Sequence, residues 1–222
     1  MTGFEISDAG RSLIDQFPTS ELLRRILPRL GEDEILLFLR QWVAEGIPFA
    51  FRECPLVYER LRSWMGRRLH VEPRNITVIG SARLGCSLAP EPDFGRRFYH
   101  GSDLDFQIIS DSLFASIVAE FFVWQSKVNT GEEQFVGKYT KRSLKCLPAN
   151  IEHGFIDAFK MDQRPYLKHV IKVTNTEDYG HDRLKATDCG PTFTKLHIRV
   201  HASFNAFFQQ MKLNLITAIS SL

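Results

Sequence analysis

Two short apolar segments, each next to polar turn residues, constrain the fold more than any other feature of the chain. The first covers residues 76–79 and ends at a Gly-Ser pair, and the second covers residues 104–109 and contains the second of two aspartates, Asp103 and Asp105. Short apolar runs bounded by Gly, Ser and Asp predict β-strands. Side chains alternate along a strand, so both aspartates are expected on one face, with the apolar neighbours buried on the other.

The two aspartates have two interpretations. Carboxylates held this close repel each other unless a cation lies between them, and oxygen ligands suit Mg²⁺, which bridges to substrate phosphates. Alternatively, they are solvated residues at a strand end, which is common for an isolated Asp-x-Asp. The upstream Gly80-Ser81 pair favours the first interpretation, because glycine lets the backbone approach phosphate oxygens and the serine hydroxyl donates a hydrogen bond.

The periodicity of the remaining chain predicts a mixed α/β protein. Residues 1–70 are expected to form an N-terminal helical segment packed on the core, and residues 71–222 a core that ends in a helix. We expect helices at residues 20–30, 32–45, 55–69, 111–128 and 203–219. We expect strands at residues 76–79, 104–110, 151–161 and 195–200. We expect loops at residues 90–101, in part of 129–150 and at 175–191.

Composition excludes several classes. The polar first ten residues predict no secretory signal, and no apolar run is long enough to span a bilayer. The four cysteines are scattered without a Cys-x-x-Cys pair, which predicts free thiols in a cytoplasmic protein rather than zinc or disulfides. Every lysine lies at Lys127 or beyond, and this last part of the chain is expected either to bind phosphates or to form a solvated basic face.

Two motifs carry a family resemblance. Residues 79–85 (Ile-Gly-Ser-Ala-Arg-Leu-Gly) and 102–106 (Ser-Asp-Leu-Asp-Phe) resemble the nucleotidyltransferase superfamily of the DNA polymerase β type. The minimal nucleotidyltransferases, the poly(A) polymerase group and the bacterial oligonucleotide second-messenger synthases are particularly similar. The resemblance covers roughly residues 71–160 and implies a polymerase-β-like core with a twisted mixed sheet.

The resemblance also implies an activity: Mg²⁺- or Mn²⁺-dependent transfer of a nucleoside monophosphate from an NTP such as ATP to a hydroxyl, with release of pyrophosphate. The acceptor would be an RNA 3′ end, a nucleotide, a protein or a small molecule. The alternatives are a catalytically inactive relative that binds nucleotides or nucleic acid, and a module that docks a partner protein, for example in a toxin–antitoxin or phage-defence pair. A homodimer is a further expectation, and no membrane contact is expected.

The resemblance assigns roles to particular residues. Asp103 and Asp105, with a third carboxylate for which Asp157 is the first choice, would be the catalytic metal ligands; Asp162 and Glu152 are weaker choices. The strands at residues 76–79, 104–109 and 155–159 should then lie side by side, so that the carboxylates converge. Nucleotide binding is assigned to Gly80, Ser81, Arg83, Lys138, Lys141 and Arg142.

The sequence departs from the family in two places. The interval from Gly80 to Asp103 is longer than usual, so residues 90–101 resemble an insertion, and little follows Asp157 except one strand and one helix. The insertion either clamps phosphates and stacks a base at the cleft mouth or is pinned to the body by its aromatic residues. The residues in question are Arg96, Arg97, Phe98 and Tyr99.

Overall fold

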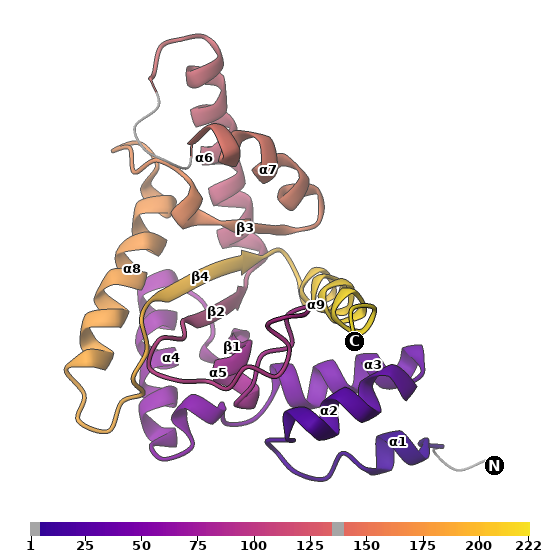
Figure 1. The fold of residues 1–222 in the computed structure, drawn as a ribbon. Helices are drawn as coiled ribbons and strands as arrows, with labels where there is room; N and C mark the ends of the chain where they lie inside the picture. The colour runs from indigo at the N-terminus through magenta and orange to yellow at the C-terminus, as the bar shows by residue number, and fades with distance from the viewer. Residues whose placement is uncertain (1–4, 135–139) are drawn as a thin grey trace.

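A computed structural model describes residues 5–134 and 140–222 and contains a four-stranded mixed sheet (Figure 1). The strand order is β1 (Ile76–Ile79), β2 (Leu104–Ile109), β4 (Leu196–His201) and β3 (Phe155–Asp157). β1 is antiparallel to β2, β2 is parallel to β4, and β4 is antiparallel to β3. The mixed α/β class is therefore confirmed.

The expectation that the strands at residues 76–79, 104–109 and 155–159 lie side by side is wrong for the third strand. β1 does pair with β2, but β4 lies between β2 and β3. Strand order is set by the packing of distant segments, and the alternation that predicted each strand contains no information about its neighbour.

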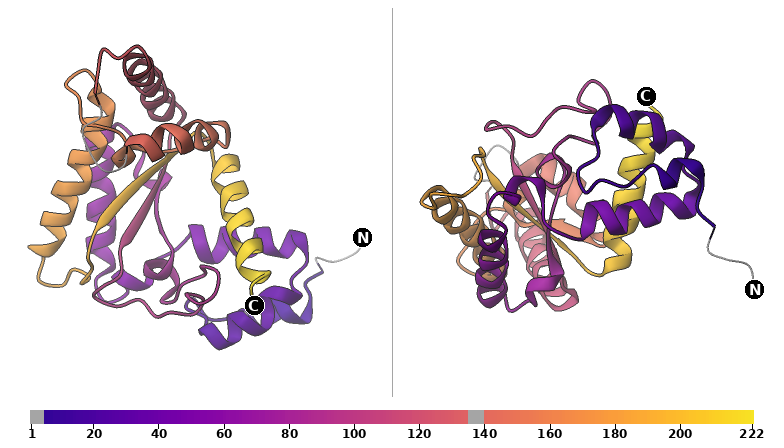
Figure 2. Two further views of the ribbon diagram at one scale, coloured as in Figure 1. Left: turned by 45° about the horizontal axis from the view of Figure 1, so that its top comes forward. Right: turned by 90° about the horizontal axis from the view of Figure 1, so that it is seen from below.

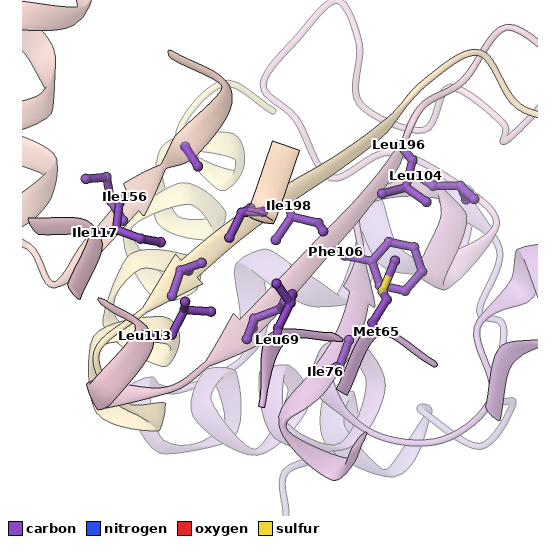
Figure 3. Packing of buried hydrophobic residues seen from close by; sticks show 14 of the residues in the cluster. Met65, Leu69, Ile76, Leu104, Phe106, Leu113, Ile117, Ile156, Leu196 and Ile198 are labelled. Carbon is purple, nitrogen blue, oxygen red and sulfur yellow. The ribbon is translucent and has the colours of Figure 1, made fainter. Parts of the chain in front are cut away.

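One face of the sheet is apolar and packs against three long helices. These are α4 (Pro55–Leu69), α6 (Asp111–Asn129) and α8 (Lys168–Lys185). Paired residues share a face, so the pairing of Phe106 with Ile198 places both side chains in this layer. Figure 3 shows the packing at close range; the labelled residues are Met65, Leu69, Ile76, Leu104, Phe106, Leu113, Ile117, Ile156, Leu196 and Ile198.

The opposite face is covered in part by the C-terminal helix α9 (Phe204–Ile219) and by the N-terminal helices (Figure 2). Ile109 at the end of β2 packs in this second apolar cluster with Phe207, Met211 and Leu215 of α9. The N-terminal contributors are α2 (Ser20–Ile26), the 3₁₀ turn η1 (Leu27–Arg29), α3 (Glu32–Phe38) and the π-helical turn η2 (Leu39–Ala44), preceded by α1 (Asp8–Arg11).

Several shorter elements complete the described chain. The 3₁₀ turns η3 (Phe49–Phe51) and η4 (Pro73–Asn75) flank α4, and α5 (Ser81–Leu84) follows β1. Helix α7 (Thr140–Glu152) leads into β3, and the 3₁₀ turn η5 (Ala158–Lys160) follows it. The segment expected as one N-terminal unit therefore contributes to both faces, with α4 in the first cluster and α2 and α3 in the second.

The expected loop at residues 175–191 is wrong for most of its length, because α8 continues to Lys185. Its buried stripe contains Glu177 and Gly180, which interrupt the apolar pattern that predicts a helix. Gly180 is needed for close packing: a Cβ there would lie 3.3 Å from Leu196 Cδ1 and 3.4 Å from Trp64 Cζ3.

The expectation of four free thiols is also wrong. Cys54 and Cys189 form a disulfide with a Cα–Cα distance of 6.1 Å, although 135 residues separate them in sequence. The bridge joins the residue before α4 to the segment after α8, and these helices pack together. Cys86 and Cys146 are free. Within the described residues, no helix has the length and apolarity needed to cross a bilayer.

Candidate functional site: a carboxylate cleft beside a Gly-Ser turn

Asp103 and Asp105 lie at the start of β2, on the sheet face opposite the three long helices. Asp103 is exposed and Asp105 is half-buried. Within the described part of the chain, neither carboxylate has a hydrogen-bond or ion-pair partner. A half-buried carboxylate without a partner is costly, so this arrangement favours a bound cation.

The electrostatic surroundings of Asp105 are mixed. Burial raises the pKa of Asp105 above its ordinary value, and the negative charges of Asp103 and Asp157 act in the same direction. His197 and Arg199 on β4 oppose that shift without cancelling it. A divalent cation would act as these two residues do, only more strongly, because it favours the charged carboxylate.

The Gly-Ser turn lies directly beside Asp105. Ile79, the last residue of β1, pairs with Asp105, so the chain leaves β1 at the point where β2 begins. Gly80 has φ +70° and ψ −151°, a conformation that is essentially restricted to glycine. A Cβ at Gly80 would lie 3.8 Å from Asp105 Oδ2, and Ser81 then begins α5.

These residues line a cleft with a volume of about 480 Å³. Gly80, Ser81, Asp103 and Asp105 line it, together with residues of η2 and α9. The apolar lining residues are Leu39, Val43, Ile79, Leu84, Leu88, Ala89, Pro90, Met211 and Leu215, and the polar ones from α9 are Asn214 and Thr217. The cleft thus combines anionic and small polar groups with an apolar surface.

The insertion at residues 90–101 is pinned by aromatic residues, as one of its two interpretations predicts, and it also borders the cleft. Phe94 is buried in the second cluster, and Phe98 is half-buried with its ring 6.5 Å from that of Phe49, so two aromatic residues pin the loop. Arg96 and Tyr99 line the cleft, and Arg96 Nη1 lies 3.0 Å from Asp93 Oδ1. Arg97 is exposed and is not among the residues that line the cleft.

Asp157 lies on the same sheet face as Asp105, but β4 separates the two strands. Its carboxylate pairs with Arg199, with Nε–Oδ1 2.7 Å and Nη2–Oδ2 3.1 Å, and Oδ2 also accepts from Lys160. Burial disfavours the charged carboxylate, but Arg199 and Lys160 outweigh it and lower the pKa of Asp157. The structure does not bring Asp157 to the carboxylate pair, and its role as a third ligand stays a prediction.

The structure turns Arg83 away from the cleft, contrary to its assignment to nucleotide binding. Arg83 is 3% exposed, and its guanidinium donates to the carbonyl oxygens of Trp42 (2.9 Å) and Gly46 (2.7 Å). Burial lowers the pKa of Arg83 to about 10. Because these carbonyls lie at the end of η2, where helical carbonyls lack partners, Arg83 holds the N-terminal segment onto the core.

For the three other basic residues assigned to the nucleotide, the structure describes no side-chain position. Lys138 lies outside the described residues. Lys141 and Arg142 fall within α7, whose described part lies beside β3, and their side chains are not among those described.

Sequence reasoning missed several residues near the site. Arg199 and Lys160 form the cationic group around Asp157, and Asn214 and Thr217 enter the cleft from α9. The alternation of the sequence predicts that His197 and Arg199 share one face of their strand. Their proximity to the aspartates could not be predicted without knowing the strand order. No local sequence pattern indicates that α9 lines the cleft, because its position depends on how the helix packs against the rest of the protein.

Asp103 and Asp105 provide only two carboxylates for a metal ion, so the kind of metal site that they fit is a restricted one. Within the described residues, no group of three or more His, Cys, Asp or Glu side chains is arranged to hold a metal ion. Mg²⁺, however, is commonly bound by one or two carboxylates together with substrate phosphates and water. The Asp103–Asp105 pair beside the Gly80 turn therefore fits Mg²⁺ that arrives with a polyphosphate.

Comparison with known proteins adds no assignment: no protein-family model, curated protein or solved structure matches this chain. The geometry of the cleft is therefore the basis on which a function is proposed.

Proposed function

We propose that the cleft binds an Mg²⁺–nucleoside triphosphate and that the protein transfers its nucleotidyl group to a hydroxyl acceptor. The single observation that carries this proposal is the convergence of the Gly80-Ser81 turn and the Asp103–Asp105 pair in one cleft. A glycine-permitted backbone turn suits the triphosphate, and two unpartnered carboxylates suit its metal. The apolar surface from η2 and α9 suits the face of a base.

Asp103 and Asp105 would hold Mg²⁺ or Mn²⁺, which supplies charge stabilisation for the triphosphate and the leaving pyrophosphate. In the transfer, the acceptor oxygen forms a bond to the α-phosphorus, and the bond from that phosphorus to the bridging oxygen breaks. The electron pair leaves with pyrophosphate, and the hydroxyl proton passes to solvent water. Ser81 would donate to a phosphate oxygen, and Arg96 and Tyr99 would border the entrance.

The proposal is tested by incubating the protein with each of the four α-labelled NTPs, with and without Mg²⁺ and bulk tRNA, followed by product analysis. We expect a labelled adduct that requires the metal and is lost in the Asp103→Asn/Asp105→Asn double variant. Unchanged product formation by that variant would refute the assignment. The exposed Asp188 offers a control as Asp188→Asn, which should behave as the wild type.

A second candidate function is nucleotide binding without transfer. It is favoured by the engagement of Asp157 with Arg199 and Lys160, which leaves two carboxylates for the metal. Metal-dependent NTP binding without any labelled product, across all acceptors tried, would support this second function over the first.

A further inference from the structure

A cationic pair lies on the other side of the carboxylates from the Gly80 turn. The strand order places β1 and its turn on one side of β2, and β4 and β3 on the other. Arg199 shares the face of Asp105, because His197 pairs with Asp105 and Arg199 lies two residues further along β4. Lys160 in η5 pairs with Asp157, which also pairs with Arg199.

The pair is held in place by a single buried carboxylate. The side chain of Asp157 is only 2% exposed, whereas those of Arg199 and Lys160 are 27% and 31% exposed. Within the described residues, Asp157 is the one carboxylate that pairs with either cation. Two cations share one anion, so the group carries excess positive charge toward solvent.

Aromatic rings further fix both cations. The Arg199 guanidinium lies 4.6 Å from the centroid of the Phe155 ring, and Lys160 Nζ lies 5.7 Å from that of Phe159. Preorganised cations lose little conformational freedom when they bind an anion. A planar guanidinium and an ammonium group are the side chains that recognise phosphate.

We infer that Arg199 and Lys160 bind a phosphate group of the acceptor, so that the hydroxyl acceptor is a nucleotide or the end of a nucleic acid and not a protein side chain. This inference rests on the proposed function. The NTP phosphates would lie at the Gly80 turn, and the acceptor phosphate would lie over β4 and β3, with the Asp103–Asp105 pair between them. Asp157 is then a positioning residue for the two cations.

The test measures how strongly the protein prefers a phosphorylated acceptor analogue. With the NTP site saturated by Mg²⁺ and α,β-methylene-ATP, AMP and adenosine are titrated calorimetrically into the wild type and two variants, Lys160→Gln and Arg199→Lys. Lys160→Gln leaves the Arg199–Asp157 pair in place, and Arg199→Lys keeps the charge but removes the fork geometry. Lys127→Gln is the matched control, since Lys127 is 38% exposed, faces Glu132 at 3.9 Å and lies 5.0 Å from the Tyr166 ring.

The wild type and Lys127→Gln should bind AMP about tenfold more tightly than adenosine, as one charge-assisted hydrogen bond implies. Lys160→Gln should lose most of that preference. Equal binding of AMP and adenosine by the wild type would overturn the inference, and so would a preference that survives in Lys160→Gln. If Arg199→Lys does not fold, Lys160→Gln alone decides.

Two further arms of the titration identify the source of the phosphate. AMP represents a free nucleotide, and a short oligoadenylate with a 3′ hydroxyl represents an RNA end. Binding of α,β-methylene-ATP is recorded separately for each variant. If the Asp103→Asn/Asp105→Asn variant binds this analogue as well as the wild type does, the proposed function fails; if only the AMP preference is absent, the acceptor inference fails alone.

Discussion

Asp105 lies beside Gly80 because its pairing partner, Ile79, is the last residue of β1. The antiparallel pairing places the end of β1 beside the start of β2, so the Gly80 turn and the Asp105 carboxylate are neighbours. The Cβ that Gly80 lacks would lie 3.8 Å from Asp105 Oδ2.

Asp105→Asn should stabilise the metal-free protein while removing metal-dependent NTP binding. The carboxylate is half-buried and has no partner among residues 5–134 and 140–222, so neutralising it at pH 7 should raise the free energy of unfolding by about 1 kcal/mol. Burial raises the pKa of Asp105, so the charged carboxylate lowers the free energy of unfolding increasingly as pH rises above the ordinary pKa of 3.8. The stability gained by Asp105→Asn should therefore shrink at low pH. Urea unfolding at pH 4 and pH 7 measures this difference. A variant less stable than the wild type at pH 7 would show that the carboxylate is already satisfied.

Gly80→Ala should weaken NTP binding more than it weakens the fold. The positive φ of +70° strains any other residue by about 1 kcal/mol. Gly131 is a matched control, because its φ is +77° and a Cβ there would meet no atom within 4 Å. Gly131→Ala should lose similar stability in thermal unfolding but retain NTP binding. Equal loss of NTP binding in both variants would separate the Gly80 turn from the nucleotide.

Asp157→Asn should destabilise the protein by about 3 kcal/mol at pH 7, because it removes the partner of two cations. Arg199 and Lys160 outweigh burial and lower the pKa of Asp157, so the carboxylate contributes stability above its ordinary pKa of 3.8 and loses it as pH falls through the lower folded value. The difference from the wild type should therefore shrink as the pH falls below 3.8. Melting curves across this range provide the measurement, and a pH-independent difference would contradict the ion-pair account.

Glu177→Gln should stabilise the protein most at alkaline pH. Burial raises the pKa of Glu177 to about 8, and its Oε1 accepts a hydrogen bond from the Ile198 backbone at 2.6 Å, which glutamine can also accept. The folded state favours the protonated acid, so Glu177 contributes fully to the stability of the wild type below pH 4.5. That contribution is lost as pH rises toward about 8. At pH 8.5 the gain should be on the order of 2 kcal/mol, and at pH 5 it should be small. The exposed Asp178 supplies the control Asp178→Asn, and equal gains at both pH values would contradict the assignment.

Local patterns predicted several of the helices that cover the two faces of the sheet. Helices α4, α6 and α9 agree with the expected ranges within a residue or so, because their apolar stripes are continuous and Pro55 and Ser203 mark two of the three starts. The approach of Gly80 to Asp105 follows from two adjacent strands joined antiparallel, which short-range reasoning can anticipate.

The features that sequence reasoning missed depend on packing between distant segments. Nothing local indicates that β4 enters between β2 and β3, so the engagement of Asp157 by Arg199 was not predicted. Arg83 was assigned from its place in a motif, but the carbonyls that it binds come from a segment about forty residues earlier. The disulfide likewise depends on the packing of α4 against α8.

The most direct test of the central claim is the fate of the label in γ-labelled NTP. In the presence of Mg²⁺, the wild type and Asp188→Asn should release labelled pyrophosphate in step with acceptor modification. The Asp103→Asn/Asp105→Asn variant should do so at least about 100-fold more slowly, a loss of about 2.7 kcal/mol of transition-state stabilisation. Label released as orthophosphate, or pyrophosphate release at the wild-type rate by the double variant, would contradict nucleotidyl transfer at this cleft.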